Sequence, residues 1–140
     1  MIWKQTLDVE SLNHSQKNSM AHWLGVKFLE VGADFITASM PVNERTKQPM
    51  GLLHGGASVA LAETLGSMAA AHCVNELSKS NVVGVEINAN HLNAAKNGEV
   101  IAKVTPIKVG RRLQIWNIDI TQGEKKICVS RLTTMTVTAN

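Results

Sequence analysis

The sequence predicts an α+β fold in which a curved antiparallel sheet wraps around one long central helix. Residues 52–74 form a continuous run rich in alanine, leucine and glycine, which is long enough for a helix and too long for a strand. Two strand-like segments precede this run, and four segments with alternating apolar residues follow it. One helix packed on one face of such a sheet buries the apolar side of both.

The first two strands are expected before the helix. Residues 8–22 are polar and only weakly helical. Segments 24–31 and 34–42 are strand-like and predict a hairpin that turns at Gly32 and Ala33. After the helix we expect an antiparallel run of four strands at 82–92, 99–109, 112–121 and 125–138, with turns at Asn97-Gly98, Gly110 and Gly123.

Small side chains dominate the predicted helix. Eleven of the twenty residues from Gly55 to Val74 are Gly, Ala or Ser. Glycine weakens the helix itself, so this composition favours a sheet that wraps closely around the helix. In the third of the later strands one face carries Gln114, Trp116, Ile118 and Ile120, and in the last strand one face carries Ile127, Val129, Thr133, Met135 and Val137.

The composition is that of an ordinary globular domain. With 140 residues, 44% of them hydrophobic, the chain fits one domain, 1–140, with one core. We expect no membrane span and no secretory leader, and therefore a cytoplasmic protein. Cys73 and Cys128 are expected to be reduced and buried, because two thiols outside a CxxC pair make no disulfide framework.

The charge of the chain argues against a nucleic-acid partner. The net charge is +3, from 14 basic and 11 acidic residues that are well mixed along the chain. No helix-turn-helix, zinc-finger or RNA-binding pattern accompanies it. The histidines and cysteines lack metal-ligand spacing, so no metal is expected. No GxSxG elbow or GxGxxG loop is present. A small molecule that bears phosphate groups fits the few cations better.

Glu63 is the only charged residue between His54 and His72. It could be a solvated position of an amphipathic helix, but no other charge shares its face. It could also be a buried acid paired with an arginine for structural reasons. An isolated carboxylate among apolar residues is unfavourable unless something compensates it. We therefore interpret Glu63 as a candidate functional acid.

The tripeptide His54-Gly55-Gly56 stands where the helix should begin. Free backbone N–H groups and the positive end of the helix dipole gather at such a position. Gly55 has no Cβ, so an oxygen of a ligand can approach its N–H closely. This is a place to hold a carbonyl that becomes an oxyanion. The glycines could equally serve only a tight turn into the helix.

The spacing of Gly55 and Glu63 implies two copies of the chain. Eight residues of helix separate them by about 12 Å along the axis, whereas reacting groups must converge within about 3–3.5 Å. If both act on one carbonyl, they come from two chains whose long helices lie side by side and antiparallel. We therefore predict a two-fold dimer with the site at its interface.

The motif RTKQPMGLLHGGASVALAETLGSM resembles the hotdog-fold acyl-CoA thioesterases, in the branch typified by 4-hydroxybenzoyl-CoA thioesterase. The segments VVGVEINANHL, KVGRRLQIW and SRLTTMTV extend the resemblance over nearly the whole chain. It implies a hotdog fold, hydrolysis of an acyl-CoA thioester, and an aromatic acyl group such as one used in menaquinone synthesis. It implies no cofactor, because coenzyme A is part of the substrate. It also implies a homotetramer built from catalytic dimers.

The resemblance assigns roles to particular positions. Glu63 falls on the catalytic carboxylate of the family, and Gly55 falls on the backbone N–H that polarises the thioester carbonyl. The positions that line the substrate are Gln48, His54, Ser67 and Met68, and those that contact coenzyme A are Gly84, His91, Lys108, Val109, Gly110, Arg111 and Arg112. A departure occurs at Asn93 and Ala94, where close relatives tend to carry Arg-Pro, so a cation suited to the CoA phosphates is missing there unless Lys96 replaces it.

The chemistry leaves two roles open for the acid. Glu63 can attack the carbonyl and form a mixed anhydride, or it can deprotonate an attacking water. The leaving thiol has a pKa near 8.5 and departs as thiolate without a strong general acid. Lys108, Arg111 and Arg112 suit the nucleotide phosphates, although such a cluster can also be a solvated turn.

Three other functions compete with this one. A broad-specificity acyl-CoA thioesterase would share the same site. A hotdog dehydratase would need a histidine base aimed at the α-carbon of the substrate, whereas His54 stands beside Gly55, next to the carbonyl. A non-catalytic acyl-CoA binder would gain nothing from Glu63, because a carboxylate repels the anionic ligand.

Overall fold

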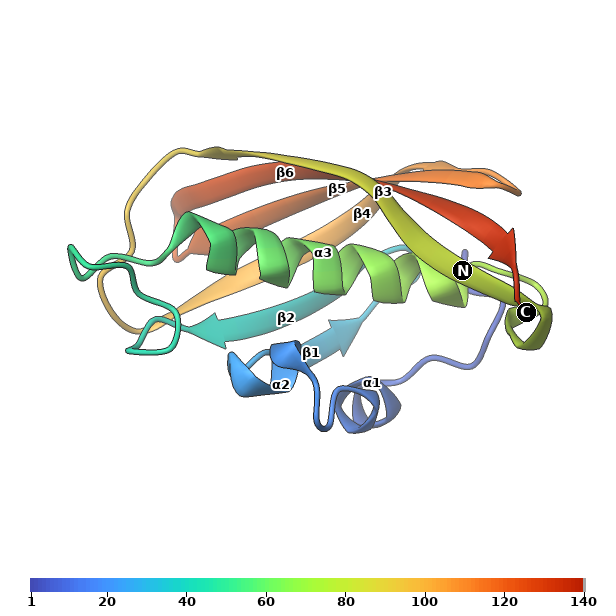
Figure 1. Ribbon diagram of the computed structural model, residues 1–140, viewed down its shortest axis with the longest axis horizontal. Coiled ribbons are helices and arrows are strands. Elements are labelled where there is room, and N and C mark those ends of the chain that lie inside the picture. The colour runs from blue at the N-terminus through green and yellow to red at the C-terminus, as the bar shows by residue number, and fades with distance from the viewer. Residues whose placement is uncertain (140) are drawn as a thin grey trace.

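The computed structural model describes residues 1–139, so that Asn140, the last residue of the expected domain, lies outside the described residues. One long helix runs along the concave side of a curved sheet (Figure 1). The elements are α1 Val9–Ser15, α2 Met20–Trp23, β1 Lys27–Val31, β2 Ile36–Pro41, α3 Gly55–His72, η1 Leu77–Lys79, β3 Ser80–His91, β4 Glu99–Val109, β5 Leu113–Gln122 and β6 Lys125–Thr138.

The sheet confirms the predicted fold class. Within residues 1–139 six strands form one sheet in the order β1-β2-β4-β5-β6-β3, and every neighbouring pair is antiparallel. The hairpin of β1 and β2 turns where the sequence predicts it, and the Gly32 N–H donates to the Phe35 carbonyl at 2.8 Å. No helix of this part of the chain has the length and apolarity needed to cross a membrane.

The predicted turn at Asn97-Gly98 is wrong as a hairpin between β3 and β4. Gly98 does have a positive φ of +71°, but β3 pairs with β6, and β4 lies between β2 and β5. The connection instead passes the start of α3, where the Leu53 N–H donates to the Ala95 carbonyl at 2.8 Å. A crossing to the far edge allows β3 to cover the side of α3 that β1 and β2 leave open (Figure 1).

The small residues of α3 let the sheet approach it closely, as expected. A Cβ on Gly66 would lie 2.4 Å from Leu132 Cδ2 of β6, so β6 occupies the space that a side chain there would need. Of the two strand faces, the first is confirmed, because Gln114, Trp116, Ile118 and Ile120 are all buried. In β6 the buried residues are instead Ile127, Cys128, Ser130, Leu132 and Thr134.

The face shared by Val129, Thr133, Met135 and Val137 is therefore the one turned away from α3. Its apolar alternation therefore does not mark the core, and the face that packs towards α3 includes the polar Ser130 and Thr134. Both cysteines are buried and free, as predicted. Burial raises the pKa of the Cys73 thiol to about 11.

Candidate active site

The start of α3 presents an unpaired backbone donor. His54 caps the helix, because its Nδ1 accepts from the Gly56 N–H at 2.8 Å. Its carbonyl accepts from the N–H groups of Ala57 and Ser58 at 3.0 and 3.2 Å. Among the described residues the Gly55 N–H has no acceptor. The first free amide of the helix is thus available to a ligand oxygen, at the end where the helix dipole is positive.

A cavity of about 400 Å³ lies at this helix start. The Gln48 carboxamide oxygen accepts from the Met50 N–H, which leaves its NH2 group as a donor. The ring of His91, at the end of β3, lies where a side chain on Gly55 would be. The cavity is lined by Gln48, Leu52, Leu53, Gly55, Ser58, His91, Leu92, Asn93, Ala94 and Ile127. Two predicted substrate or CoA positions therefore meet Gly55, whereas His54 serves as the helix cap.

Glu63 lines a second cavity, of about 310 Å³, together with the predicted Ser67 and Met68. The position of a Cβ on Gly84 would be 2.6 Å from Glu63 Oε1, so the carboxylate lies directly against the β3 backbone. Glu63 is half-buried, not fully buried as the apolar surroundings in the sequence suggest. The reason is that the helix face of Glu63, Ala60 and Ser67 is only partly covered in the single chain.

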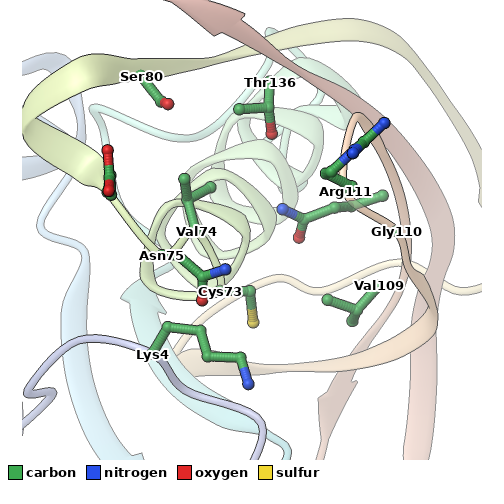
Figure 2. Close-up of a pocket in the computed structure, with 11 residues that line it drawn as sticks. Lys4, Cys73, Val74, Asn75, Ser80, Val109, Gly110, Arg111 and Thr136 are labelled. Atoms are coloured by element: carbon green, nitrogen blue, oxygen red, sulfur yellow. The ribbon is translucent and has the colours of Figure 1, made fainter.

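The predicted CoA-contacting segment lies at the other end of α3. Val109, Gly110 and Arg111 border a cavity of about 560 Å³ together with Cys73 and residues that follow α3. Figure 2 shows Lys4 and Arg111 on opposite sides of this cavity. Arg111 and Arg112 also line a neighbouring cavity of about 400 Å³. Lys108 is exposed in β4 and lines neither.

The structure thus distributes the predicted residues along α3 in three groups, at its start, its middle and its end. Gly55 and Glu63 are both in α3, so the distance of about 12 Å between them along the helix is retained. One chain alone does not bring the amide, the acid and the cations to one point.

Some residues of these cavities escape prediction from the sequence, and Gln16, Met20 and Ser58 are examples. Gln16 and Met20 line the Glu63 cavity, and the Gln16 Nε2 lies 3.5 Å from Met68 Sδ. Ser58 lines the Gly55 cavity. The first two come from the N-terminal segment, which tertiary packing lays beside α3, and no spacing signal connects residues so far apart. Ser58 lies three residues after Gly55, and its place on a helix starting there was the available signal.

Comparison with known proteins identifies the family. The family model described as Thioesterase superfamily matches residues 50–129, which include α3 and most of the sheet. The chain belongs to the thioesterase superfamily. It is a thioester hydrolase with the hotdog fold that this family adopts.

Relatives within the thioesterase superfamily match nearly the full chain. The 1,4-dihydroxy-2-naphthoyl-CoA hydrolase of Escherichia coli is 46% identical over 96% of this chain and 98% of its own. A proofreading thioesterase of Cronobacter sakazakii is 44% identical over 96% of this chain and 97% of its own. The crystal structure of a mutant thioesterase from Pseudomonas aeruginosa superimposes with a TM-score of 0.95 at 47% identity, covering 99% of this chain and 100% of that one.

Proposed function

We propose that this thioesterase hydrolyses an acyl-CoA thioester to the free acid and coenzyme A. The unpaired Gly55 amide at the start of α3 carries this proposal, because it offers a donor where a thioester carbonyl can dock. Such a hydrogen bond strengthens as negative charge develops on the carbonyl oxygen, and one donor of this kind contributes roughly 3–4 kcal/mol in other enzymes. The name of the Escherichia coli relative supports a CoA ester.

The catalytic unit is a two-fold dimer in this proposal. Within the described residues β3 pairs only with β6, and its exposed residues include Val83 at 42% and Val85 at 54%. Two such edges related by a two-fold axis pair antiparallel and continue the sheet. Since α3 lies alongside β3 (Figure 1), the two helices then run antiparallel. That arrangement brings the partner's Glu63 towards Gly55.

The same dimer accounts for the CoA-contacting positions. The turn with Arg111 and Arg112 lies at the far end of α3 within one chain. In an antiparallel pair that end of the partner lies beside the start of the first helix. The cations of the partner would then reach the nucleotide phosphates of a CoA ester whose carbonyl lies at Gly55. Association of two such dimers into a tetramer belongs to the same proposal.

Thioester hydrolysis can be written by two routes that use only Glu63, the carbonyl donors and one water molecule. In the general-base route Glu63 takes a proton from water while the water oxygen bonds to the carbonyl carbon, and the π electron pair moves to the carbonyl oxygen. Collapse of this intermediate breaks the C–S bond, and the electron pair leaves with the sulfur. In the nucleophilic route Glu63 bonds to the carbonyl carbon first, and the C–S bond breaks as the thiolate leaves with the electron pair. Water then cleaves the mixed anhydride to the free acid and regenerates the Glu63 carboxylate. Both routes use the same geometry.

The favoured acyl group is aromatic, with 1,4-dihydroxy-2-naphthoyl-CoA as the leading substrate. The Escherichia coli relative supports this choice by its name. The proofreading thioesterase of Cronobacter sakazakii has nearly the same identity to this chain and a different name. Overall similarity therefore does not select the acyl group, and broad acyl-CoA hydrolysis is the competing function.

A panel of aromatic and aliphatic CoA thioesters, assayed for free thiol, tests the proposal. We expect fastest thiol release from the aromatic esters and a loss of at least about 100-fold in Glu63→Gln, which keeps the shape of the side chain. Glu124→Gln is the matched control, because Glu124 is exposed in the turn between β5 and β6 and lines none of these cavities.

Near-normal turnover by Glu63→Gln would contradict the assigned acid. Equal rates across the panel would replace the aromatic preference by broad specificity. Release of no thiol from any ester would leave a binder of acyl-CoA, and formation of an alkene from a hydroxyacyl ester would indicate a dehydratase.

A further inference from the structure

His91 lies against the start of α3 and not beside the cations. The position of a Cβ on Gly55 would be 2.9 Å from His91 Nε2, 3.1 Å from Cε1 and 3.3 Å from Cδ2. These three distances are nearly equal, so the imidazole lies with its face over the Gly55 backbone at Nε2, and the in-plane Nε2–H direction points past Gly55. Its side chain lines the same cavity as Gln48 and Gly55. A residue expected from the resemblance to contact coenzyme A therefore stands at the carbonyl end of the site.

The backbone that carries this ring is fixed by strand pairing. His91 is the last residue of β3 and pairs with Cys128 of β6. The next residue, Leu92, donates its N–H to the Ile127 carbonyl at 2.8 Å. Among the described residues neither ring nitrogen of His91 has a hydrogen-bond partner. The ring is thus positioned on one side by Gly55 and has its polar atoms free for a ligand.

We propose that His91 is a catalytic residue whose Nε2–H donates a second hydrogen bond to the thioester carbonyl, beside the Gly55 amide. This inference rests on the proposed thioester hydrolysis. The neutral imidazole can carry a proton on Nε2 and acts as a donor without changing its charge. As water or Glu63 bonds to the carbonyl carbon, the π electron pair moves to the oxygen, and both donors stabilise it. His91 keeps its proton throughout.

The neighbourhood of His91 argues against a phosphate contact. The following residues are Leu92, Asn93 and Ala94, none of them a cation, and the nearby Lys125 ammonium is already engaged by the Ala94 carbonyl. Lys108, Arg111 and Arg112 belong to the β4–β5 region at the other end of α3. His54 is a poorer candidate for the second donor, because its side chain caps the helix and does not line the cavity at Gly55.

Two thioesters with the same acyl group separate the two roles. One is the CoA ester, and the other is the N-acetylcysteamine ester, which lacks the nucleotide. We expect His91→Ala to lose roughly 100- to 1000-fold in kcat/KM on both esters, mainly through kcat, because removal of one oxyanion donor has an effect on this scale. His91→Gln, which retains an N–H donor, should recover part of the loss. Arg111→Ala is the matched control and should lose rate on the CoA ester alone.

A loss in His91→Ala confined to the CoA ester, and expressed in KM, would overturn the proposal in favour of a nucleotide contact. Unchanged rates on both esters would show that His91 has no role. If His91→Ala does not fold, as judged by thermal melting, His91→Leu, which fills more of the space and also lacks the donor, takes its place. An unaltered kcat of that variant on the truncated ester overturns the proposal as well. If the unaltered protein cleaves neither ester, the proposed function itself fails, and this inference falls with it.

Discussion

The role of a single residue in this chain depends on the side chains that pack against it. Glycine at position 84 is a clear case, because the resemblance assigns it to coenzyme A, whereas the structure places the Glu63 carboxylate against it. The Cβ of an alanine side chain at this position would lie 2.6 Å from Glu63 Oε1, which is too close for both atoms to stay in place. The carboxylate is the far end of a flexible side chain, so it can move away at little cost in stability. Its position for catalysis would nevertheless change.

We therefore expect Gly84→Ala to fold normally and to lose about tenfold or more in kcat, since displacement of a reacting group by about 1 Å has large effects on rate. Steady-state thiol release and urea unfolding measure the two quantities. A double-mutant cycle with Glu63→Gln provides the control, and the two changes should be non-additive because both act on one carboxylate. Additive losses would assign Gly84 a role separate from Glu63.

At the scale of elements, α3 depends more on its packing against the sheet than on the intrinsic helix propensity of its sequence. Its glycines lower helix propensity by about 1 kcal/mol each relative to alanine. A glycine fits at position 66, in the interior of α3, because Leu132 of β6 occupies the space that a side chain there would need. The composition of the helix is thus explained by the closeness of the sheet.

Gly66→Val tests this packing. The side chain would lie against Leu132, and overpacking of a dense core destabilises by about 1–3 kcal/mol, which exceeds the small gain in helix propensity. We expect a net loss of about 1–2 kcal/mol in the free energy of unfolding, measured with urea. Ala71→Val, at a half-buried position of the same helix, should cost only its propensity difference. Equal stability of the two variants would mean that β6 shifts to accommodate the larger side chain at position 66 at little cost in free energy.

At the scale of the whole molecule, the proposed site combines residues that one chain keeps apart. Gly55 and Gln48 line one cavity and Glu63 another. A shared site across a dimer predicts complementation between an inactive Glu63→Gln chain and an inactive Gln48→Ala chain. Each mixed dimer would hold one intact site of two, so an equal mixture after subunit exchange should regain about a quarter of the original activity.

Thiol release after mixing, with subunit exchange followed by a labelled chain, measures the recovery. Each variant re-mixed with itself is the control and should stay inactive. Absence of recovery despite complete exchange would place all catalytic groups within a single chain and would refute the interface site.

Local sequence signals determined much of this protein. The length and composition of 55–72 define the helix, the alternation in β4 and β5 defines strands, and the isolation of Glu63 and the His54-Gly55-Gly56 start single out the acid and the donor. These local signals predict the helix and the strands because helix and strand periodicity depend on near neighbours in the chain. Only the tertiary structure decided that β3 crosses to the far edge, that the β6 core face is the one with Ser130 and Leu132, and that His91 lies on Gly55. Those outcomes depend on which surfaces remain uncovered once the sheet curves around α3, and no short stretch of sequence encodes that.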